Sequence, residues 1–203
     1  MMKRLPSLLL DTHLAAMYLT LPNILTLLRI LAVPVFAIAV WYGHNVEACV
    51  IFALAGLTDL LDGYIARRFN QKSAVGALLD PAADKLLMTT AFVLLAMPIE
   101  HLVIRIPAWV AILAISRDVA ISLVALMSAD HFDAAKFRPS FLGKLTTGFQ
   151  LVIISLTLLF NALGPQPWYS FLVPWMHYLI AALVLASGTH YFFRATVQRT
   201  ESS

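Results

Sequence analysis

The fold of this chain is decided by residues 48–97, ACVIFALAGLTDLLDGYIARRFNQKSAVGALLDPAADKLLMTTAFVLLAM, in which two long apolar runs enclose a charged segment. The runs cover residues 48–66 and 78–97, and about 20 mainly apolar residues are enough for a helix to cross a membrane. The segment between them holds Arg67, Arg68 and Lys72. We therefore predict two neighbouring transmembrane helices joined by a short connection.

The composition of the whole chain also indicates a membrane protein. Of its 203 residues, 61% are hydrophobic and 12% are charged, about half the charged share of a soluble domain, and the mean hydropathy is +0.83. These values exclude a soluble globular enzyme, a disordered chain and, despite a pI near 9.2, a nucleic-acid-binding protein. The lone Cys49 permits no intrachain disulfide.

Six apolar stretches of suitable length account for nearly the whole chain. Because they rarely alternate with a period of two, they indicate helices and not the strands of a membrane barrel. We predict an all-α, polytopic integral membrane protein with one domain over residues 1–203, an interfacial segment at 1–20 and a cytoplasmic tail at 194–203. The six predicted transmembrane helices cover residues 24–42, 48–66, 78–97, 107–129, 145–163 and 171–193.

Positive side chains are divided unevenly between the two sides of this predicted bundle. Ten Lys and Arg residues flank the spans on the side of the two termini, whereas the opposite connections hold only Arg105. Cytoplasmic connections carry the excess of Lys and Arg in membrane proteins. We therefore expect a multi-pass protein, surrounded by membrane lipids, with both termini in the cytoplasm.

Four aspartates stand near the predicted cytoplasmic ends of the second and third spans: Asp59, Asp62, Asp80 and Asp84. The spacing within each pair is three or four residues, so each pair lies on one helix face. On neighbouring helices the four carboxylates would converge and repel one another at a depth where charge is costly. Divalent cations such as Mg²⁺, Mn²⁺ or Ca²⁺ would neutralise them. The alternative is interfacial ion pairing with nearby basic residues, Arg67, Arg68 and Lys85.

Small residues accompany the aspartates. Gly63 and Ala66 leave one helix face bare, which lets a phosphorylated group approach the backbone or another helix pack there. Arg67 adds a planar cation suited to phosphate, and Gly76 opens the start of the third span. The sequence is compatible with two positions for Pro81, at the first turn of its helix after an Asp80 N-cap or inside a helix that begins near Gly76.

Together these residues form a known signature. The pattern Asp59-x2-Asp62-Gly63-x2-Ala66-Arg67-x8-Gly76-x3-Asp80-x3-Asp84 resembles that of the CDP-alcohol phosphotransferases at every position. The similarity covers about residues 20–195 and includes, before the first span, Pro22-Asn23-x2-Thr26-x2-Arg29.

Two further motifs are particularly similar to CMP-forming cardiolipin synthases: Ile115-Ser116-Arg117-Asp118 and Arg138-Pro139-Ser140-x3-Lys144. Another motif, Gly143-Lys144-x-Thr146-Thr147-x2-Gln150, resembles phosphatidylglycerophosphate synthases at least as well as it resembles cardiolipin synthases.

The resemblance implies a metal-dependent transferase that uses CDP-diacylglycerol and releases CMP. Two divalent ions, Mg²⁺ or Mn²⁺, would be held by the four aspartates, Asp59, Asp62, Asp80 and Asp84. The residues that would line the CDP-diacylglycerol site are Gly63, Ala66, Arg67 and Gly76. Asp84 would also be the general base that takes the proton from an acceptor hydroxyl. The family further implies a homodimer.

The acceptor is expected to be anionic and to contain glycerol. Candidate ligands for its phosphate flank the fourth and fifth spans on the side of the aspartates: Arg117, Arg138 and Lys144. The alternatives are contacts with lipid headgroups for Arg138 and Lys144, and an ion pair with Asp118 for Arg117. Phosphatidylglycerol, which would give cardiolipin, and glycerol 3-phosphate both fit. The Arg138-Pro139-Ser140 match favours phosphatidylglycerol.

A cation transporter with an acidic pathway is the alternative from another functional class. It would distribute acidic groups through the depth of the membrane, or break helices in two related halves. Here the acidic cluster stays on one side and the halves share no motif, which favours an enzyme with its active site near the cytoplasmic face.

Overall fold

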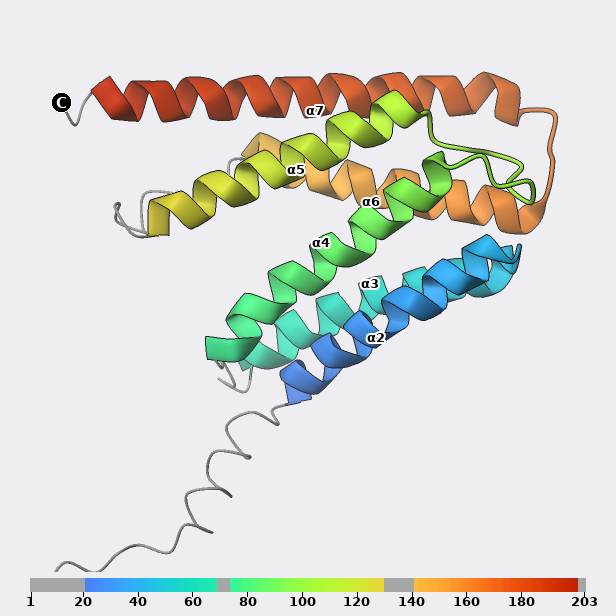
Figure 1. The fold of residues 1–203 in the computed structure, drawn as a ribbon, viewed down its shortest axis with the longest axis horizontal. Coiled ribbons are helices and arrows are strands. Elements are labelled where there is room, and N and C mark those ends of the chain that lie inside the picture. Colours follow the sequence, from blue (N-terminus) through green and yellow to red (C-terminus); the bar gives the residue numbers. More distant parts are fainter. Residues whose placement is uncertain (1–20, 69–73, 130–140, 201–203) are drawn as a thin grey trace, which may run out of the picture.

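The computed structural model is all-α over the residues that it describes (Figure 1). It describes the backbone of residues 21–68, 74–129 and 141–200, and the side chains of residues 23–59, 79–123 and 141–190. Each predicted span coincides with one helix of this backbone, which confirms the prediction of six helices. They are α2 (Leu21–Trp41), α3 (Asn45–Arg68), α4 (Ala74–Ala96), α5 (Ala108–Ala129), α6 (Phe141–Leu163) and α7 (Tyr169–Thr200).

Two details of the predicted boundaries change. Helix α7 continues to Thr200, so most of the segment expected to form a tail after residue 193 is helical. Helix α4 begins at Ala74 and places Pro81 inside the helix, which decides between the two positions that the sequence allowed. A proline inside a helix removes one backbone hydrogen bond, a loss that membrane helices tolerate when neighbouring groups replace it.

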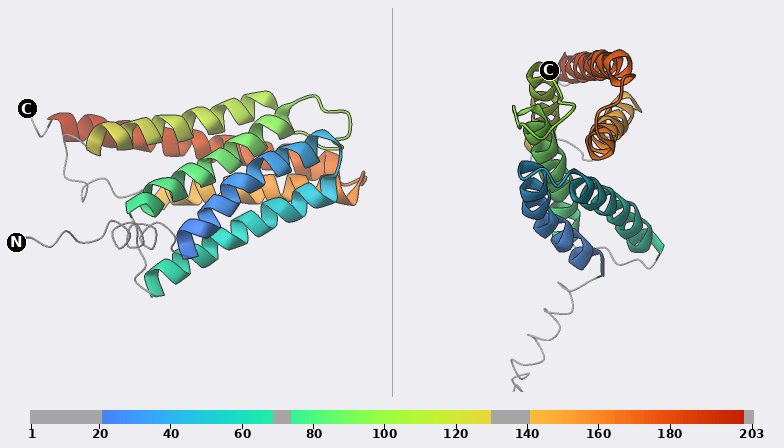
Figure 2. Two further views of the ribbon diagram at one scale, coloured as in Figure 1. Left: turned by 60° about the horizontal axis from the view of Figure 1, so that its bottom comes forward. Right: turned by 90° about the vertical axis from the view of Figure 1, so that its right-hand side faces the viewer.

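The helices contact one another in a ring. Helix α2 packs against α3 and α4, α3 against α6, α6 against α7, α7 against α5, and α5 against α4. Helix α4 also contacts α6 across this ring. Figure 2 shows α4 between the pair α2 and α3 on one side and the helices α5 and α7 on the other.

The surface of the bundle carries many large apolar side chains. Phe36 and Phe92 are buried in the core, while side chains as large as Leu31, Ile112 and Leu185 are exposed. Exposed apolar side chains in such number are typical of a surface in contact with a membrane. Within the described residues, three helices are long and apolar enough to cross one: Asn23–Trp41, Phe141–Leu163 and Tyr169–His190. The ionisable residues of the site described below lie on the other helices, α3, α4 and α5, with the exception of Arg29, which lies on α2.

The connection between α4 and α5 is fastened to α6 by one buried amide. Asn161 accepts a hydrogen bond from the backbone N–H of Ile104 at 3.0 Å and donates to its carbonyl at 2.9 Å. Its amide nitrogen also donates to the carbonyl of Thr157 at 2.8 Å. Because these backbone groups are buried, the side chain supplies the partners that water would otherwise provide.

Candidate active site

The candidate site lies where the core-facing sides of three helices change from apolar to polar. Residues three or four apart share a helix face, so each polar position continues a buried apolar row. The buried residues next along these rows are Val33 on α2, Ala55 on α3 and Leu87 on α4. The polar positions that follow them are Thr26 and Arg29 on α2, Asp59 on α3, and Asp80 and Asp84 on α4.

Arg29 joins the two acidic helices at this end. Its Nη1 atom lies 2.7 Å from Oδ1 of Asp84 and 3.0 Å from Oδ1 of Asp59. Since both oxygens contact the same nitrogen, the carboxylates of α3 and α4 are immediate neighbours, as the sequence predicted. A buried guanidinium is stable only when it is paired, and here the aspartates supply the pairing.

Thr26, one turn before Arg29, makes the corresponding contact to the third carboxylate. Its hydroxyl donates a hydrogen bond to Oδ1 of Asp80. The spacing of three residues places both donors on one face of α2. Helix α2 therefore presents a donor to each of the three described aspartates.

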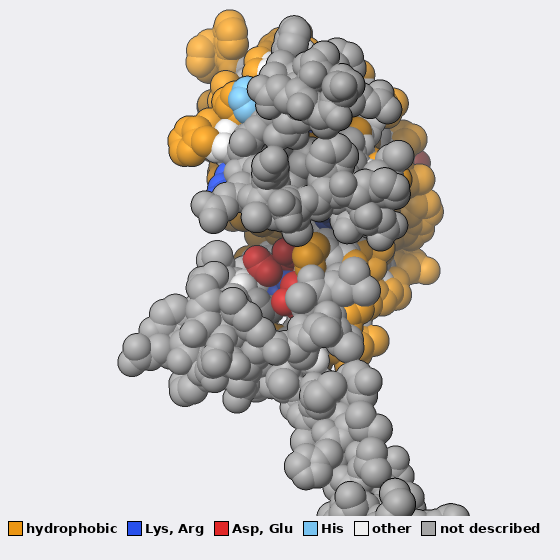
Figure 3. All heavy atoms as spheres, turned by 90° about the vertical axis from the view of Figure 1, so that its left-hand side faces the viewer, with side chains coloured by type: hydrophobic (Ala, Val, Ile, Leu, Met, Phe, Trp, Pro, Cys, Tyr) orange, Lys and Arg blue, Asp and Glu red, His pale blue; other side chains and the backbone are white. Residues whose placement is uncertain are grey.

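The carboxylates remain open on their outer side. The Arg29 side chain is 0% exposed, whereas those of Asp59 and Asp84 are 39% and 40% exposed. Figure 3, which looks onto this end of the molecule, shows acidic side chains at the surface with basic ones beside them. A ligand can therefore reach the aspartates from outside while Arg29 contacts them from within.

The donor set has the chemistry of a site for hard cations, because carboxylate oxygens are the ligands that Mg²⁺ and Mn²⁺ prefer. The described residues alone do not contain three His, Cys, Asp or Glu side chains grouped closely enough to hold a metal ion. The fourth aspartate, Asp62, belongs to α3, but its side chain is outside the described residues. The same is true of the predicted CDP-diacylglycerol residues, Gly63, Ala66, Arg67 and Gly76.

A second polar centre joins α5, α6 and α7. The guanidinium of Arg117 pairs with Asp118 at 2.7 Å, which is the ion pair that the sequence offered as an alternative. It also donates to the hydroxyl of Ser187 at 2.8 Å and to the carbonyl of Gly143 at 3.2 Å. The amide of Gln150 donates to Asp118 at 3.2 Å. Arg117 is thus held in the bundle by three helices.

Lys85 connects the two centres. It follows Asp84 in the chain, and its ammonium donates to the hydroxyl of Ser122 on α5, which in turn donates to the carbonyl of Asp118 at 2.5 Å. The ion-pairing alternative proposed Arg67, Arg68 and Lys85 as partners of the aspartates. Among the described residues, Arg29 takes that place and Lys85 turns to α5.

The remaining predicted acceptor ligands are only partly described. Lys144 lies on α6 beside Gly143, and its side chain is exposed. Arg138 falls outside the described residues, as does the predicted interfacial segment at 1–20.

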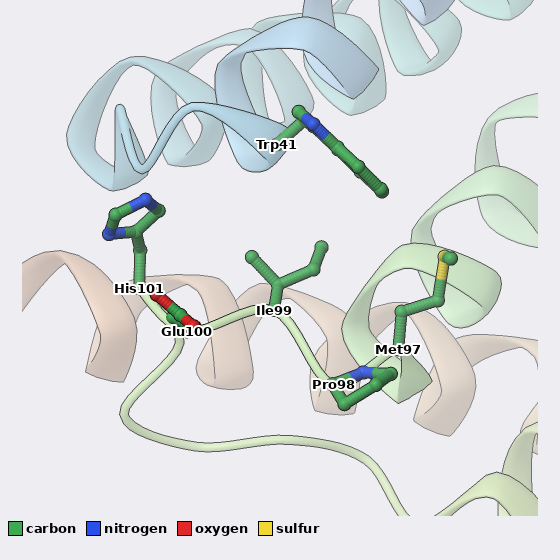
Figure 4. A pocket seen from close by; sticks show the side chains of 6 residues that line it. All are labelled: Trp41, Met97, Pro98, Ile99, Glu100 and His101. Atoms are coloured by element: carbon green, nitrogen blue, oxygen red, sulfur yellow. The ribbon is translucent and has the colours of Figure 1, made fainter.

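A cavity of about 310 Å³ lies at the opposite end of the bundle (Figure 4). Trp41 faces it from the end of α2, and the other lining residues follow α4: Met97, Pro98, Ile99, Glu100 and His101. Trp41 lies about 18 Å along the α2 axis from Arg29. The cavity is therefore separate from the aspartates.

A comparison with known family models finds a match over most of the chain. The model of the CDP-alcohol phosphatidyltransferases matches residues 19–186, from the start of α2 into α7. The chain belongs to this family. The family is membrane-bound, in agreement with the apolar surface of the six helices.

Relatives of two kinds are similar to the chain. One is a fusion protein of CMP-forming cardiolipin synthase and mitochondrial hydrolase from Schizosaccharomyces pombe, 34% identical over 85% of this chain and 30% of that protein. A CMP-forming cardiolipin synthase from Rattus norvegicus is 32% identical over 88% of this chain and 63% of that protein. A CDP-diacylglycerol–glycerol-3-phosphate 3-phosphatidyltransferase from Shigella flexneri is 30% identical over 88% of this chain and 96% of that protein.

The chain thus spans less than two thirds of the length of these two cardiolipin synthase relatives and nearly all of the Shigella protein.

Thr26 and Arg29 belong to the motif before the first predicted span, and the sequence alone assigns no role to either. The structure makes both of them contacts of the aspartates. One signal for Arg29 is visible in the sequence, because it is a charged residue inside an otherwise apolar span. No comparable signal marks Ser122 or Ser187, since a serine in a membrane helix can bond its own backbone.

Proposed function

We propose that this protein transfers a phosphatidyl group from CDP-diacylglycerol to the hydroxyl of phosphatidylglycerol, giving cardiolipin and CMP. The observation that carries the proposal is the juxtaposition of Asp59 and Asp84 on one buried arginine in a chain of the CDP-alcohol phosphatidyltransferase family. The open outer side of both carboxylates gives substrates access to them.

In the proposed reaction an acceptor oxygen attacks the phosphorus that carries the diacylglycerol. The bond from that phosphorus to the CMP oxygen breaks, and the acceptor proton passes to Asp84. The guanidinium of Arg29, 2.7 Å from Oδ1 of Asp84, favours the carboxylate form of this side chain, which is the form that accepts a proton. No covalent intermediate with the protein is needed, because the acceptor oxygen itself displaces CMP from the phosphorus.

Two divalent cations would be held by the four aspartates, and they would stabilise negative charge on the pyrophosphate and the departing CMP. The residues proposed to receive the CDP group lie between the two aspartate pairs in the chain: Gly63, Ala66, Arg67 and Gly76. For the phosphate of the acceptor we propose Arg117, Arg138 and Lys144. Arg117 pairs with Asp118, and the backbone carbonyl of Asp118 accepts a hydrogen bond from Ser122, the partner of Lys85.

The choice of phosphatidylglycerol rests on the Arg138-Pro139-Ser140 motif and on the identity of 32–34% to proteins named as cardiolipin synthases. Glycerol 3-phosphate is the second candidate, because a named CDP-diacylglycerol–glycerol-3-phosphate 3-phosphatidyltransferase aligns over 88% of the chain and 96% of its own length. Both acceptors are anionic and offer a glycerol hydroxyl. Family membership and the one-sided acidic cluster favour either reaction over cation transport.

We further propose that the aspartates lie near the cytoplasmic face. The start of α2, the end of α3 and the start of α4 lie at the same end of the bundle as the end of α7 (Figure 1). This end carries the excess of Lys and Arg in the sequence, and such an excess is typical of the cytoplasmic side. At that face, the CMP product could leave the site into water.

The decisive experiment measures CMP release by the purified protein with CDP-diacylglycerol and Mn²⁺ or Mg²⁺. Phosphatidylglycerol and glycerol 3-phosphate are supplied in parallel reactions, and the lipid products are separated. We expect CMP and cardiolipin with phosphatidylglycerol. Release with glycerol 3-phosphate alone would replace the proposed acceptor by the second candidate, and release with neither would contradict an anionic glycerol acceptor.

A further inference from the structure

We propose that Arg29 is a positioning residue, a built-in counter-charge that holds the carboxylates of Asp59 and Asp84 together when no divalent cation is bound and opposes the cation when it binds. This inference rests on the proposed cation site and concerns a residue outside the eight-residue signature. It makes Arg29 a determinant of cation affinity.

The first step is the geometry of the charge. A single nitrogen, Nη1 of Arg29, contacts one oxygen of each carboxylate, at 2.7 Å for Asp84 and 3.0 Å for Asp59. These aspartates belong to different helices, α4 and α3, and the arginine belongs to a third. Without a positive charge between them, the two carboxylates would repel at short range in a medium of low dielectric.

The second step is the direction of approach. Arg29 is fully buried, while about two fifths of each carboxylate side chain stays exposed. The arginine therefore neutralises the carboxylates from the inside and leaves their outer side accessible. A cation that binds from outside meets acidic groups already held side by side, with a fixed positive charge behind them.

The third step is the support of Arg29 by its own helix. Thr26, three residues earlier on the same face, donates to Asp80, so α2 fixes two points on α4. From the arginine, the buried row of α2 continues through Val33 and Phe36 into the core. Because this row anchors the helix, removal of the charge should leave the backbone in place.

The consequence follows from thermodynamic linkage. A change that destabilises the cation-free protein more than the cation-bound protein must increase cation affinity. Replacement of Arg29 by methionine keeps much of the side-chain length and removes the charge. We expect Arg29→Met to lower the melting temperature of the cation-free protein. We also expect it to bind Mn²⁺ at least about tenfold more tightly, because the repulsion between Mn²⁺ and a nearby unit positive charge is worth more than a tenfold change in affinity at an effective dielectric constant near 20.

The test measures Mn²⁺ binding to the purified protein by the paramagnetic resonance of free Mn²⁺, and thermal unfolding with and without Mn²⁺. Arg29→Lys should restore an affinity close to that of the wild type, because it keeps the charge. The matched control is Arg117→Met, which removes the second mostly buried arginine among the residues whose side chains are described. It should lower the melting temperature equally with and without Mn²⁺ and leave the affinity unchanged.

Two outcomes would overturn the inference and are distinguishable. In the first outcome, the wild-type protein binds Mn²⁺ and the Arg29→Met variant binds it no more tightly. This result would contradict the counter-charge role and leave the proposed function standing. Wild-type protein that binds no Mn²⁺ would overturn the cation site itself and, with it, the role of Arg29. If Arg29→Met is too unstable to purify, Arg29→Gln provides the same loss of charge with a polar side chain.

Discussion

Arg117 on α5 donates a hydrogen bond from Nη2 to the hydroxyl of Ser187 on α7, at 2.8 Å. The same nitrogen donates to the carbonyl of Gly143 on α6, and Nη1 pairs with Asp118. One mostly buried guanidinium thus joins three helices in the half of the bundle that lies away from α2. Because the charge of Arg117 is compensated by Asp118, the packing of this half should depend on that carboxylate.

The first prediction concerns this ion pair. Asp118→Asn keeps the shape of the side chain but leaves the guanidinium without a negative partner, and the loss of one member of a buried pair costs about 3 kcal/mol. The free energy of unfolding can be measured by SDS titration in mixed micelles. Lys144→Gln, at an exposed position of α6, is the control and should change stability by less than about 0.5 kcal/mol. Equal stability of Asp118→Asn and wild type would mean that the neutral partners of Arg117 suffice.

The second prediction concerns the proposed base. Asp84→Asn removes the proton acceptor with little change in volume, so CMP release should fall at least about a hundredfold. Binding of CDP-diacylglycerol, measured by equilibrium dialysis in detergent, should be largely retained. Glu100→Gln, which removes an exposed carboxylate at the opposite end of the bundle, should leave CMP release unchanged. Activity retained by Asp84→Asn would assign the base to another group.

The third prediction concerns metal removal. If divalent cations are held by the aspartates, EDTA should abolish CMP release, and excess Mn²⁺ or Mg²⁺ should restore it. The folded protein should also melt at a higher temperature with Mn²⁺ than with EDTA, because a ligand that binds only the folded state stabilises it. Full CMP release in EDTA would contradict a metal-dependent transferase.

The fourth prediction compares two glycines that end helices. Gly43 and Gly164 have φ values of 78° and 76°, in the left-handed region that costs other residues about 1 kcal/mol. A Cβ on Gly43 would lie 2.8 Å from Cγ of His101, whereas a Cβ on Gly164 has no neighbour within 4 Å. Gly164→Ala should therefore cost about 1 kcal/mol of unfolding free energy, and Gly43→Ala at least about 1 kcal/mol more. Equal losses would mean that His101 moves aside without cost.

The fifth prediction concerns Asn161, the amide that fastens the connection before α5. Asn161→Ala removes three hydrogen bonds and leaves buried backbone groups of Ile104 without a partner, at a cost of about 3 kcal/mol. Asn45→Ala is the matched control, because the amide of Asn45 donates one exposed hydrogen bond, to the carbonyl of His101 at 3.2 Å. It should cost about 0.5 kcal/mol. SDS titration of both variants makes the comparison, and similar losses would show that the burial of Asn161 is unimportant.

Much of the fold could be predicted because its causes are local. A helix crosses a membrane when about 20 successive residues are apolar, and each of the six predicted stretches coincides with a helix. The helix ends were less predictable. Helix α4 begins before Pro81 and α7 continues past Arg194, because backbone hydrogen bonding extends a helix beyond the residues that hydrophobicity marks.

The candidate site, too, has features that the sequence predicts and features that it does not. Asp80 and Asp84 share a helix face by their spacing alone, and the short connection from α3 to α4 brings Asp59 near them. By contrast, the partner of Asp59 and Asp84 is Arg29, some 30 to 55 residues away in the chain. Only the packing of α2 against α3 and α4 determines which basic side chain reaches the carboxylates.

Lys85 shows the physical reason most directly. It is next to Asp84 in the chain, and sequence proximity made it a candidate partner of the aspartates. Successive residues point in directions about 100° apart around a helix with 3.6 residues per turn, so Asp84 turns toward Arg29 of α2 while Lys85 turns toward Ser122 of α5. The sequence by itself determined that these charges lie on a membrane helix and at what spacing. The tertiary structure decided their partners, because partners depend on which helix faces meet.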